Sequence, residues 1–250
     1  MRKNKFWILL GLIILLSLGS QLIAQANRIL TIAPTAQTSS IGNVMLPMMN
    51  PARNLFNKDH FSFSRVNWMT NIVNDMNYNF VNLDRGPFGV NVMFFNYGEQ
   101  NQADEYGIIQ GKFTPLSAVY ARKVNKYNLG LNAKIITHDL HTQKATGFVL
   151  GVGGYFPKVY KDLDVDVMIN NFGIPPKFGE VKSELPTSVN ISMTYPYKEW
   201  MFYEQYNIFK KFHTWGGGVS YNYKNMLWGK LGYYLDKTHK LNYPTFGLDF

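Results

Sequence analysis

Two short stretches of the sequence bring together residue types that could do metal or acid–base chemistry. HDLH, at positions 138–141, carries His138, Asp139 and His141, and DLDVDV, at positions 162–167, is a row of three carboxylates. Imidazole beside a carboxylate suits a general base or a zinc site, and a row of carboxylates suits Ca²⁺. Whether either stretch can do this chemistry depends on the elements that carry it.

The HDLH stretch does not predict a catalytic or metal site. On a β-strand, residues three positions apart face opposite sides, so His138 and His141 would not share a metal ion. We expect His138 where a strand runs into an outer loop, and a solvated loop is the preferred interpretation. The sequence also lacks the Gly-x-Ser-x-Gly, His-Glu-x-x-His and phosphate-binding glycine motifs. We therefore expect no enzyme, no catalytic residue and no cofactor.

The carboxylate row raises a second alternative, a Ca²⁺ site. Asp162, Asp164 and Asp166 share one face of a strand and could supply oxygen ligands. An EF-hand loop starting at Asp162 needs Gly at its sixth position and Glu at its twelfth, whereas Val167 and Gly173 stand there. A lumen-facing acidic row balanced by Lys or Arg from neighbouring strands is the favoured interpretation, so no metal is expected.

Period-two alternation is the main structural signal in the chain. In SVNISMTY, positions 188–195, apolar side chains stand at the odd positions and polar ones at the even positions. Such runs approach the ~9–11 residues of a tilted membrane strand, against about 5–6 in a globular strand. They predict an all-β fold, an antiparallel transmembrane β-barrel of about 12 strands. The expected strands are 60–69, 74–83, 87–98, 113–124, 127–138, 145–156, 162–172, 187–196, 199–209, 214–223, 226–235 and 243–250. Of the first pattern, Val189, Ile191, Met193 and Tyr195 are expected to face lipid, and Ser188, Asn190, Ser192 and Thr194 the lumen.

The connections between these strands alternate in length. Asn125-Lys126 and Lys224-Asn225 are typical of tight turns, whereas 99–112, 173–186 and 236–242 are longer links. Bacterial outer-membrane barrels have short periplasmic turns and longer outer loops. A soluble β-sandwich or lipocalin-like barrel explains the alternation equally well, but it explains the strand lengths and the loop parity less well.

The last strand, YPTFGLDF, places Phe246, Leu248 and Phe250 on one face. Because no water satisfies an open sheet edge in lipid, we expect 243–250 to close the barrel by pairing with 60–69.

Composition excludes several classes. Charged residues make up only 16%, against roughly 25% in average soluble domains, and aromatics make up another 16%. The chain has no cysteine, which excludes disulfides and thiolate metal sites. Its net charge is +9, but no basic helix or zinc spacing predicts nucleic-acid binding.

Three segments are expected along the chain. Residues 1–26 have the cationic start, the apolar run and the AQA site of a cleaved signal peptide. The alternative is an uncleaved anchor helix, although the apolar run is short for the roughly 20 residues of a span. Residues 27–58 form an irregular segment that either plugs the lumen or is a flexible periplasmic tail. Residues 59–250 form the barrel.

The stretch SSIGNVMLPMMNPARNLF, residues 39–56, resembles the N-terminal signature of the PorV/PorQ family of FadL-like outer-membrane barrels. The matching residues are Gly42 and the tripeptide Asn50, Pro51 and Ala52. The resemblance continues, in order, through FSFSRVNWM, GPFGVNVMFFNYG, LGLNAKIITHDL, NNFGIPP, LPTSVNISMTY and GGGVSYNYKNMLWGKLGYY. The chain departs from the family in two ways. The stretch between Gly42 and Asn50 is shorter than in the family, and the sequence predicts about 12 strands, whereas FadL-like barrels resemble 14-stranded ones.

The resemblance implies location in the bacterial outer membrane and an accessory role in type IX protein secretion. The partners it implies are outer-membrane lipid and either secretion-system components or secreted cargo. The alternatives are a FadL-like channel for hydrophobic small molecules and a purely structural barrel or surface antigen. An apolar lumen cavity would favour the channel, and an outer-loop groove would favour the secretion role.

The first prediction concerns export. The mature protein is expected to begin at Asn27, because AQA at 24–26 is the small-x-small site best placed after the apolar run. N-terminal sequencing of membrane-extracted protein tests this, and an intact Met1 would contradict it.

Overall fold

The computed structural model describes residues 28–31, 33–56, 59–67, 75–102, 107–140, 143–238 and 240–249. The expected signal peptide, His141 and Phe250 lie outside these residues.

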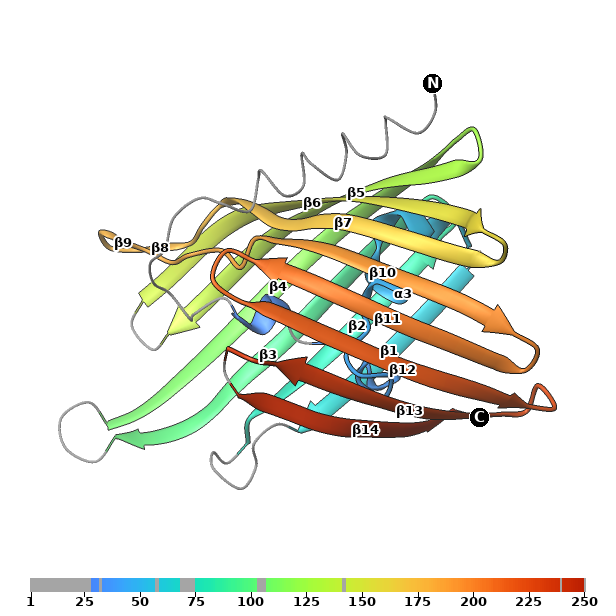
Figure 1. The fold of residues 1–250 in the computed structure, drawn as a ribbon. Coiled ribbons are helices and arrows are strands. Elements are labelled where there is room, and N and C mark those ends of the chain that lie inside the picture. The colour runs from blue at the N-terminus through green and yellow to red at the C-terminus, as the bar shows by residue number, and fades with distance from the viewer. Residues whose placement is uncertain are drawn as a thin grey trace.

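In the part of the chain that the structure describes, one antiparallel sheet of 12 strands forms the wall of the molecule, and each wall strand pairs with the next one along the chain (Figure 1). The predicted all-β fold and strand number are therefore confirmed. A separate hairpin of two short strands, β8 and β9, each two residues long, lies in the sequence between the seventh and eighth strands of the wall. The wall strands are β1 (Asp59–Asn67), β2 (Asn77–Arg85), β3 (Phe88–Gln102), β4 (Gly107–Val124), β5 (Tyr127–Leu140), β6 (Gln143–Tyr160), β7 (Leu163–Ile174), β10 (Ser188–Tyr197), β11 (Trp200–Phe209), β12 (His213–Tyr223), β13 (Leu227–Asp236) and β14 (Leu241–Asp249), with β8 (Lys177–Phe178) and β9 (Val181–Lys182) between them.

The expected long link at 99–112 is wrong. β3 continues to Gln102 and β4 already begins at Gly107, and the two pair from Glu99 opposite Gln110. A register shift between Asn96 and Glu99 separates this extension from the rest of the ladder. Backbone hydrogen bonds to a neighbouring strand can sustain a polar segment as a strand, although it shows no apolar alternation.

The two ends of the wall differ in their connections. Counted in order around the wall, every even strand except the last is joined to the next odd strand by a short turn in the described residues. These five turns are at 86–87, 125–126, 161–162, 198–199 and 224–226. Since consecutive strands are antiparallel, these turns all lie at one end, which is toward the right of Figure 1. The β8–β9 hairpin lies at the opposite end, within the link expected at 173–186.

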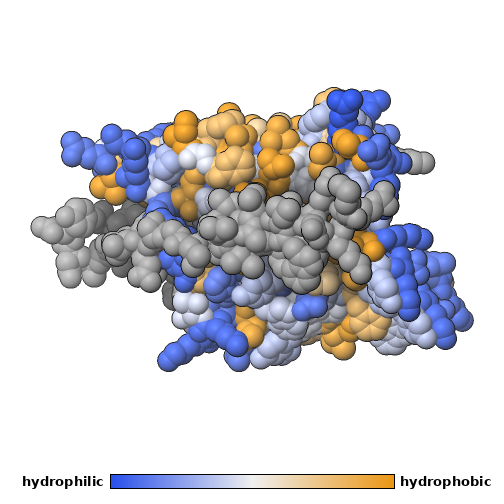
Figure 2. Space-filling model, turned by 45° about the horizontal axis from the view of Figure 1, so that its top comes forward, coloured by the Kyte–Doolittle hydropathy of each residue, from blue (hydrophilic) through white to orange (hydrophobic). Residues whose placement is uncertain are grey.

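The wall is apolar outside, and parts of its inner face are polar. On β10, the polar residues Ser188, Asn190, Ser192 and Thr194 are all buried, whereas Met193 between them is 41% exposed. The predicted division of 188–195 into an outward apolar face and an inward polar face is therefore confirmed. Figure 2 shows hydrophobic side chains gathered across the middle of one face, with hydrophilic side chains at both ends.

The N-terminal segment lies inside the wall as four short helical pieces. These are η1 (Arg28–Thr31), α2 (Ala36–Ser39), α3 (Leu46–Met49) and η2 (Pro51–Phe56). Ile41, Val44 and Ala52 are completely buried. η2 contacts β4, β5 and β6, whereas α2 contacts β14 and α3 contacts β7 and β10 (Figure 1). We call residues 33–56 the plug. No helix of the described residues is long and apolar enough to cross a membrane.

The expected pairing of 243–250 with 60–69 is not found. Among the described residues, β14 pairs only with β13 and β1 only with β2. Phe246 and Leu248 remain 83% and 62% exposed. A cavity of about 520 Å³ is lined by residues of both edges and of α2. The plug and this cavity lie where the closing contacts were expected, so the sequence-based expectation of closure is wrong for the residues described.

Candidate functional site

The loop of the plug around Gly42 fits against glycines of the wall. Gly42 has a φ of +75°, a conformation that a residue with a Cβ adopts at a cost. Its backbone N–H donates to Thr245 Oγ1 at 2.9 Å, and the Thr245 hydroxyl donates to the Ser40 carbonyl at 3.0 Å. A Cβ on Gly216 or Gly232 would collide with the Gly42 backbone, so both positions need glycine for this approach.

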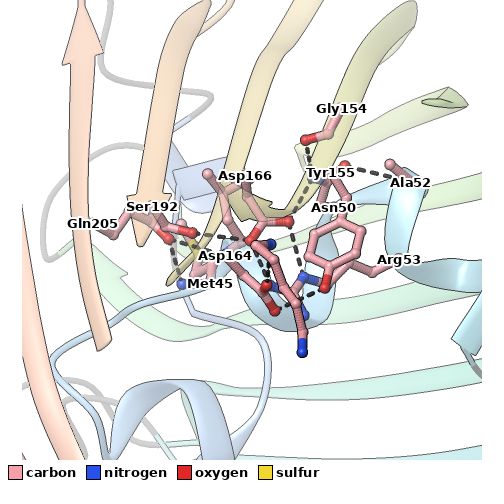
Figure 3. A network of polar contacts seen from close by, with 12 residues as sticks. Met45, Asn50, Ala52, Arg53, Gly154, Tyr155, Asp164, Asp166, Ser192 and Gln205 are labelled. Carbon is pink, nitrogen blue, oxygen red and sulfur yellow. Dashed lines mark hydrogen bonds and ion pairs between the residues drawn. The ribbon is translucent and has the colours of Figure 1, made fainter. Parts of the chain in front are cut away.

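Asn50 makes the central contact of the plug. It precedes Pro51 and has the extended backbone that a residue before proline prefers, with φ −67° and ψ 119°. Its Nδ2 donates to the Gly154 carbonyl at 3.0 Å and to Asp166 Oδ1 at 2.9 Å, while its Oδ1 accepts from the Ala52 N–H at 3.0 Å (Figure 3). The side-chain amide thus joins the wall and the plug backbone.

Two glycines of the wall make room for this turn. A Cβ on Gly153 would meet Asn50 Oδ1, and a Cβ on Gly130 would meet the Pro51–Ala52 peptide. Gly130 and Gly153 thus allow the plug to pack closely against the wall.

Arg53 pairs with Asp166 in a bidentate geometry. Its Nε donates to Oδ1 at 2.9 Å and its Nη2 to Oδ2 at 2.7 Å, and the Asp166 side chain is fully buried. Burial acts to lower the pKa of Arg53, but the hydrogen bond and the charge of Asp166 outweigh it, so the pKa is raised. The guanidinium also lies 4.2 Å from the centre of the Tyr155 ring (Figure 3).

The three carboxylates of the DLDVDV row have separate partners. Asp164 Oδ2 accepts from the Tyr155 hydroxyl at 2.7 Å, and Asp162 forms an exposed ion pair with Lys158 at 3.3 Å. The expectation that Lys or Arg from neighbouring strands would balance the row is wrong for Asp166, because its cation comes from the plug. The described residues contain no group of three His, Cys, Asp or Glu side chains that could hold a metal.

A second anchor holds the start of α3. Gln205 Oε1 accepts from the backbone N–H groups of Met45 and Leu46, both at 2.8 Å. Its Nε2 donates to Asn207 Oδ1 at 2.6 Å, and Asn190 donates to the same oxygen at 2.6 Å. The sequence analysis did not identify Gln205. The feature that could have identified it is a polar side chain at an inward-facing position of an alternating strand.

His138 is not in a solvated loop. β5 continues to Leu140, and His138 is 1% exposed, with its ring centre 4.2 Å from that of Phe113. It lies beside an apolar cluster on the inner face that includes Phe95, Ile136 and Val149. The expectation of a solvated loop is therefore wrong.

A small cavity lies between the plug and the inner face of the wall. Its volume is about 100 Å³, and its lining includes Met45, Met49, Met93 and Met168. Lys134 also lines it and donates to the side-chain oxygens of Asn170 at 3.2 Å and Asn171 at 3.0 Å. The lining is therefore mainly apolar with one buried cation.

These contacts hold a segment inside the barrel. The motif residues Asn50, Pro51 and Ala52 lie together at the Asp166 anchor, while Gly42 lies at a separate contact with β12–β14. A scan of protein-family models and a search of curated proteins find no match to this chain.

The second prediction concerns the Asp166 anchor. Removing one partner of a buried ion pair costs about 3 kcal/mol or more, which favours release of the plug by roughly a hundredfold. Asp166→Asn should therefore accelerate trypsin cleavage after Arg53 by that order.

Asp162→Asn is the matched control, because its exposed pair contributes about 0–1 kcal/mol and its loss should leave cleavage unchanged. Both proteins are first checked as folded by a gel band that migrates differently before and after heating. Equal cleavage rates of Asp166→Asn and the unaltered protein would then show that Asp166 does not hold the plug.

Proposed function

We propose that this chain is an outer-membrane β-barrel protein of PorV/PorQ type, acting as a plugged accessory component of type IX protein secretion. The observation that carries the proposal is the filled lumen, in which Asn50 and Arg53 tie the plug to the buried Asp166. A barrel whose lumen is occupied in this way offers its surface to partner proteins rather than a path for solutes.

The polarity of the wall supports a membrane location. Soluble proteins rarely expose contiguous apolar patches of more than a few hundred Å². Here the outward positions of successive strands carry exposed apolar side chains, and the polar residues are buried. In a bilayer this arrangement is favourable for the wall strands from β2 to β13, because each of them pairs on both sides in the described residues and its backbone is satisfied without water. The exposed set includes Phe94 on β3, Leu116 on β4, Leu129 and Ile135 on β5, Val152 on β6 and Phe202 on β11.

The position of the motif residues supports the family type. The tripeptide Asn50-Pro51-Ala52 is common, but here it forms the turn that places Arg53 against Asp166. In bacterial outer-membrane barrels the short turns face the periplasm and the longer loops face outward. By this rule the outer surface is the end opposite the short turns, where β3 and β4 extend and the β8–β9 hairpin lies. We assign contact with secreted cargo or with secretion components to that end.

The second candidate, a FadL-like channel for hydrophobic molecules, is favoured by one observation. The cavity beside the plug is lined by four methionines and one buried lysine, a setting suited to an amphipathic molecule. Its volume of about 100 Å³ is well below the ~300–1,000 Å³ of most small-molecule sites. The cavity of about 520 Å³ between the edges of the wall is large enough, but charged and polar side chains such as Arg53, His60 and Asp84 line it, which suits a hydrophobic molecule poorly. A channel would therefore require the plug to move, and we rank the accessory role first.

The third prediction tests the membrane location. Ile191 faces outward near the middle of β10, so Ile191→Arg should lower the free energy of unfolding by about 2–4 kcal/mol in vesicles. Tyr197→Arg is the control on the same face at the end of the strand, where the cost is about 0–1 kcal/mol. Urea titration of the folded protein in phosphatidylcholine vesicles measures both. Equal costs at the two positions would contradict a bilayer around the wall.

The fourth prediction separates the two functions. Deleting the gene in its source bacterium should leave type IX cargo in the periplasm, and a plasmid copy should restore its surface location. Cell fractionation and cargo immunoblots measure this. Normal cargo location together with lost uptake of a labelled fatty acid would contradict the accessory role and support the channel.

A further inference from the structure

A lysine lies over a neighbouring tyrosine at four of the five short turns. The distances from Nζ to the ring centre are 5.2 Å for Lys126 over Tyr127, 5.5 Å for Lys161 over Tyr160, 5.6 Å for Lys198 over Tyr197 and 5.2 Å for Lys224 over Tyr223. The four pairs belong to four different hairpins at the same end of the wall. We call these eight residues the lysine–tyrosine rim.

The tyrosines of the rim stand at the border of the apolar surface. Tyr197 continues the outward face of β10 that carries Ile191 and Met193, and it is 52% exposed. Tyr223 similarly follows the outward Tyr221 on β12. Figure 2 shows hydrophilic side chains beyond the hydrophobic middle of the molecule. A phenol ring at this border with an ammonium beyond it matches the headgroup level of a bilayer.

Most cations that the structure describes at this end have no ion pair with another described residue. Among the described residues it carries eight exposed cations and three exposed acids, a net of five positive charges. Only two of the cations are paired, Arg85 with Asp59 at 3.8 Å and Lys158 with Asp162 at 3.3 Å. The unpaired cations are therefore accessible to negative charges from outside the chain. The eight are Arg85, Arg122, Lys123, Lys126, Lys158, Lys161, Lys198 and Lys224, and the acids are Asp59, Asp162 and Glu199.

Turn geometry does not explain the choice of lysine. Lys161, Lys198 and Lys224 have φ values of +51°, +54° and +53°, a conformation in which Gly or Asn is far more comfortable. Retaining lysine at three such positions is consistent with a role for its charge, because a strained backbone persists where the residue is useful.

We propose that the lysine–tyrosine rim binds anionic phospholipid headgroups of the leaflet at the short-turn end. Each ammonium meets a lipid phosphate, and the tyrosine ring below it packs at the level of the glycerol backbone. The inference rests on the proposed membrane location and adds a specific lipid partner to it. It assigns one headgroup site to each of the four hairpins.

Trp200 reports on one of these sites. It is 41% exposed, lies two positions after Lys198, and its ring centre is 4.6 Å from that of Tyr221. Brominated lipids quench tryptophan fluorescence on contact, so the protein is folded into mixed vesicles in which either phosphatidylglycerol or phosphatidylcholine is brominated. The difference between the protein and its Trp200→Phe variant isolates the signal of Trp200.

We expect Trp200 to contact phosphatidylglycerol about five times as often as phosphatidylcholine, as judged from the quenching by each brominated lipid. In Lys198→Gln this ratio should fall toward one. Lys210→Gln, at the opposite end of the neighbouring strand, is the control of equal charge and should keep the preference. Added salt should weaken the preference, because exposed charges are screened.

An equal response of Trp200 to the two lipids, with the heat-modifiable folded band present, would overturn the rim while leaving the membrane location intact. Equal loss of preference in Lys198→Gln and Lys210→Gln would also overturn it, since net charge alone would then explain the effect. Quenching by neither lipid would contradict the membrane location itself. Should Lys198→Gln fail to fold, Lys198→Arg and Tyr197→Leu provide the test. The preference should be retained in the first and reduced in the second, which lacks the ring under the ammonium.

Discussion

The buried carboxylate of Asp166 is the constraint on which the interior depends. A fully buried charge costs several kcal/mol unless it is paired and hydrogen-bonded. The wall supplies Ser192 as one neighbour, with its hydroxyl 3.4 Å from Oδ2, but the cation and the amide come from Arg53 and Asn50 of the plug. Removing the plug would leave the charge with neither of these partners, so the wall and the plug are coupled by electrostatics.

The same constraint explains the shape of the plug. Asn50 must be extended before Pro51 for its amide to reach Asp166, and the next residues must turn back to bring Arg53 to the same carboxylate. This requires close approach to the wall, which Gly130 and Gly153 permit. Gln205 holds the start of α3 from another strand. The plug is thus fixed at separate points around the wall rather than at one hinge.

Much of the wall could be predicted from the sequence, because alternation is local. A run such as 188–195 carries its own face assignment, and tight turns such as 125–126 have a recognisable composition. The polar extension after Asn96 could not be found this way, since pairing with β4 rather than alternation keeps it in the sheet. Closure was expected from the cost of open edges in lipid, but local sequence does not reveal what lies between those edges.

The anchor itself was beyond sequence reasoning. Arg53 and Asp166 are 113 positions apart, and the acidic row gives no sign that its cation comes from the plug. The motif residues lie in the same segment as Arg53, and Asn50 contacts the wall as well as forming a local turn.

Hydrogen exchange of the protein folded into lipid vesicles tests the attachment of the plug to the wall most directly. Mass spectrometry of peptides covering residues 41–53 reports how often the plug leaves the wall. The account predicts that plug amides bonded within the interior, such as those of Leu46 and Ala52, exchange about as slowly as those of the central strands. Exchange of the whole segment at the rate of an unstructured peptide, while the strands stay protected, would contradict a plug held by Asp166.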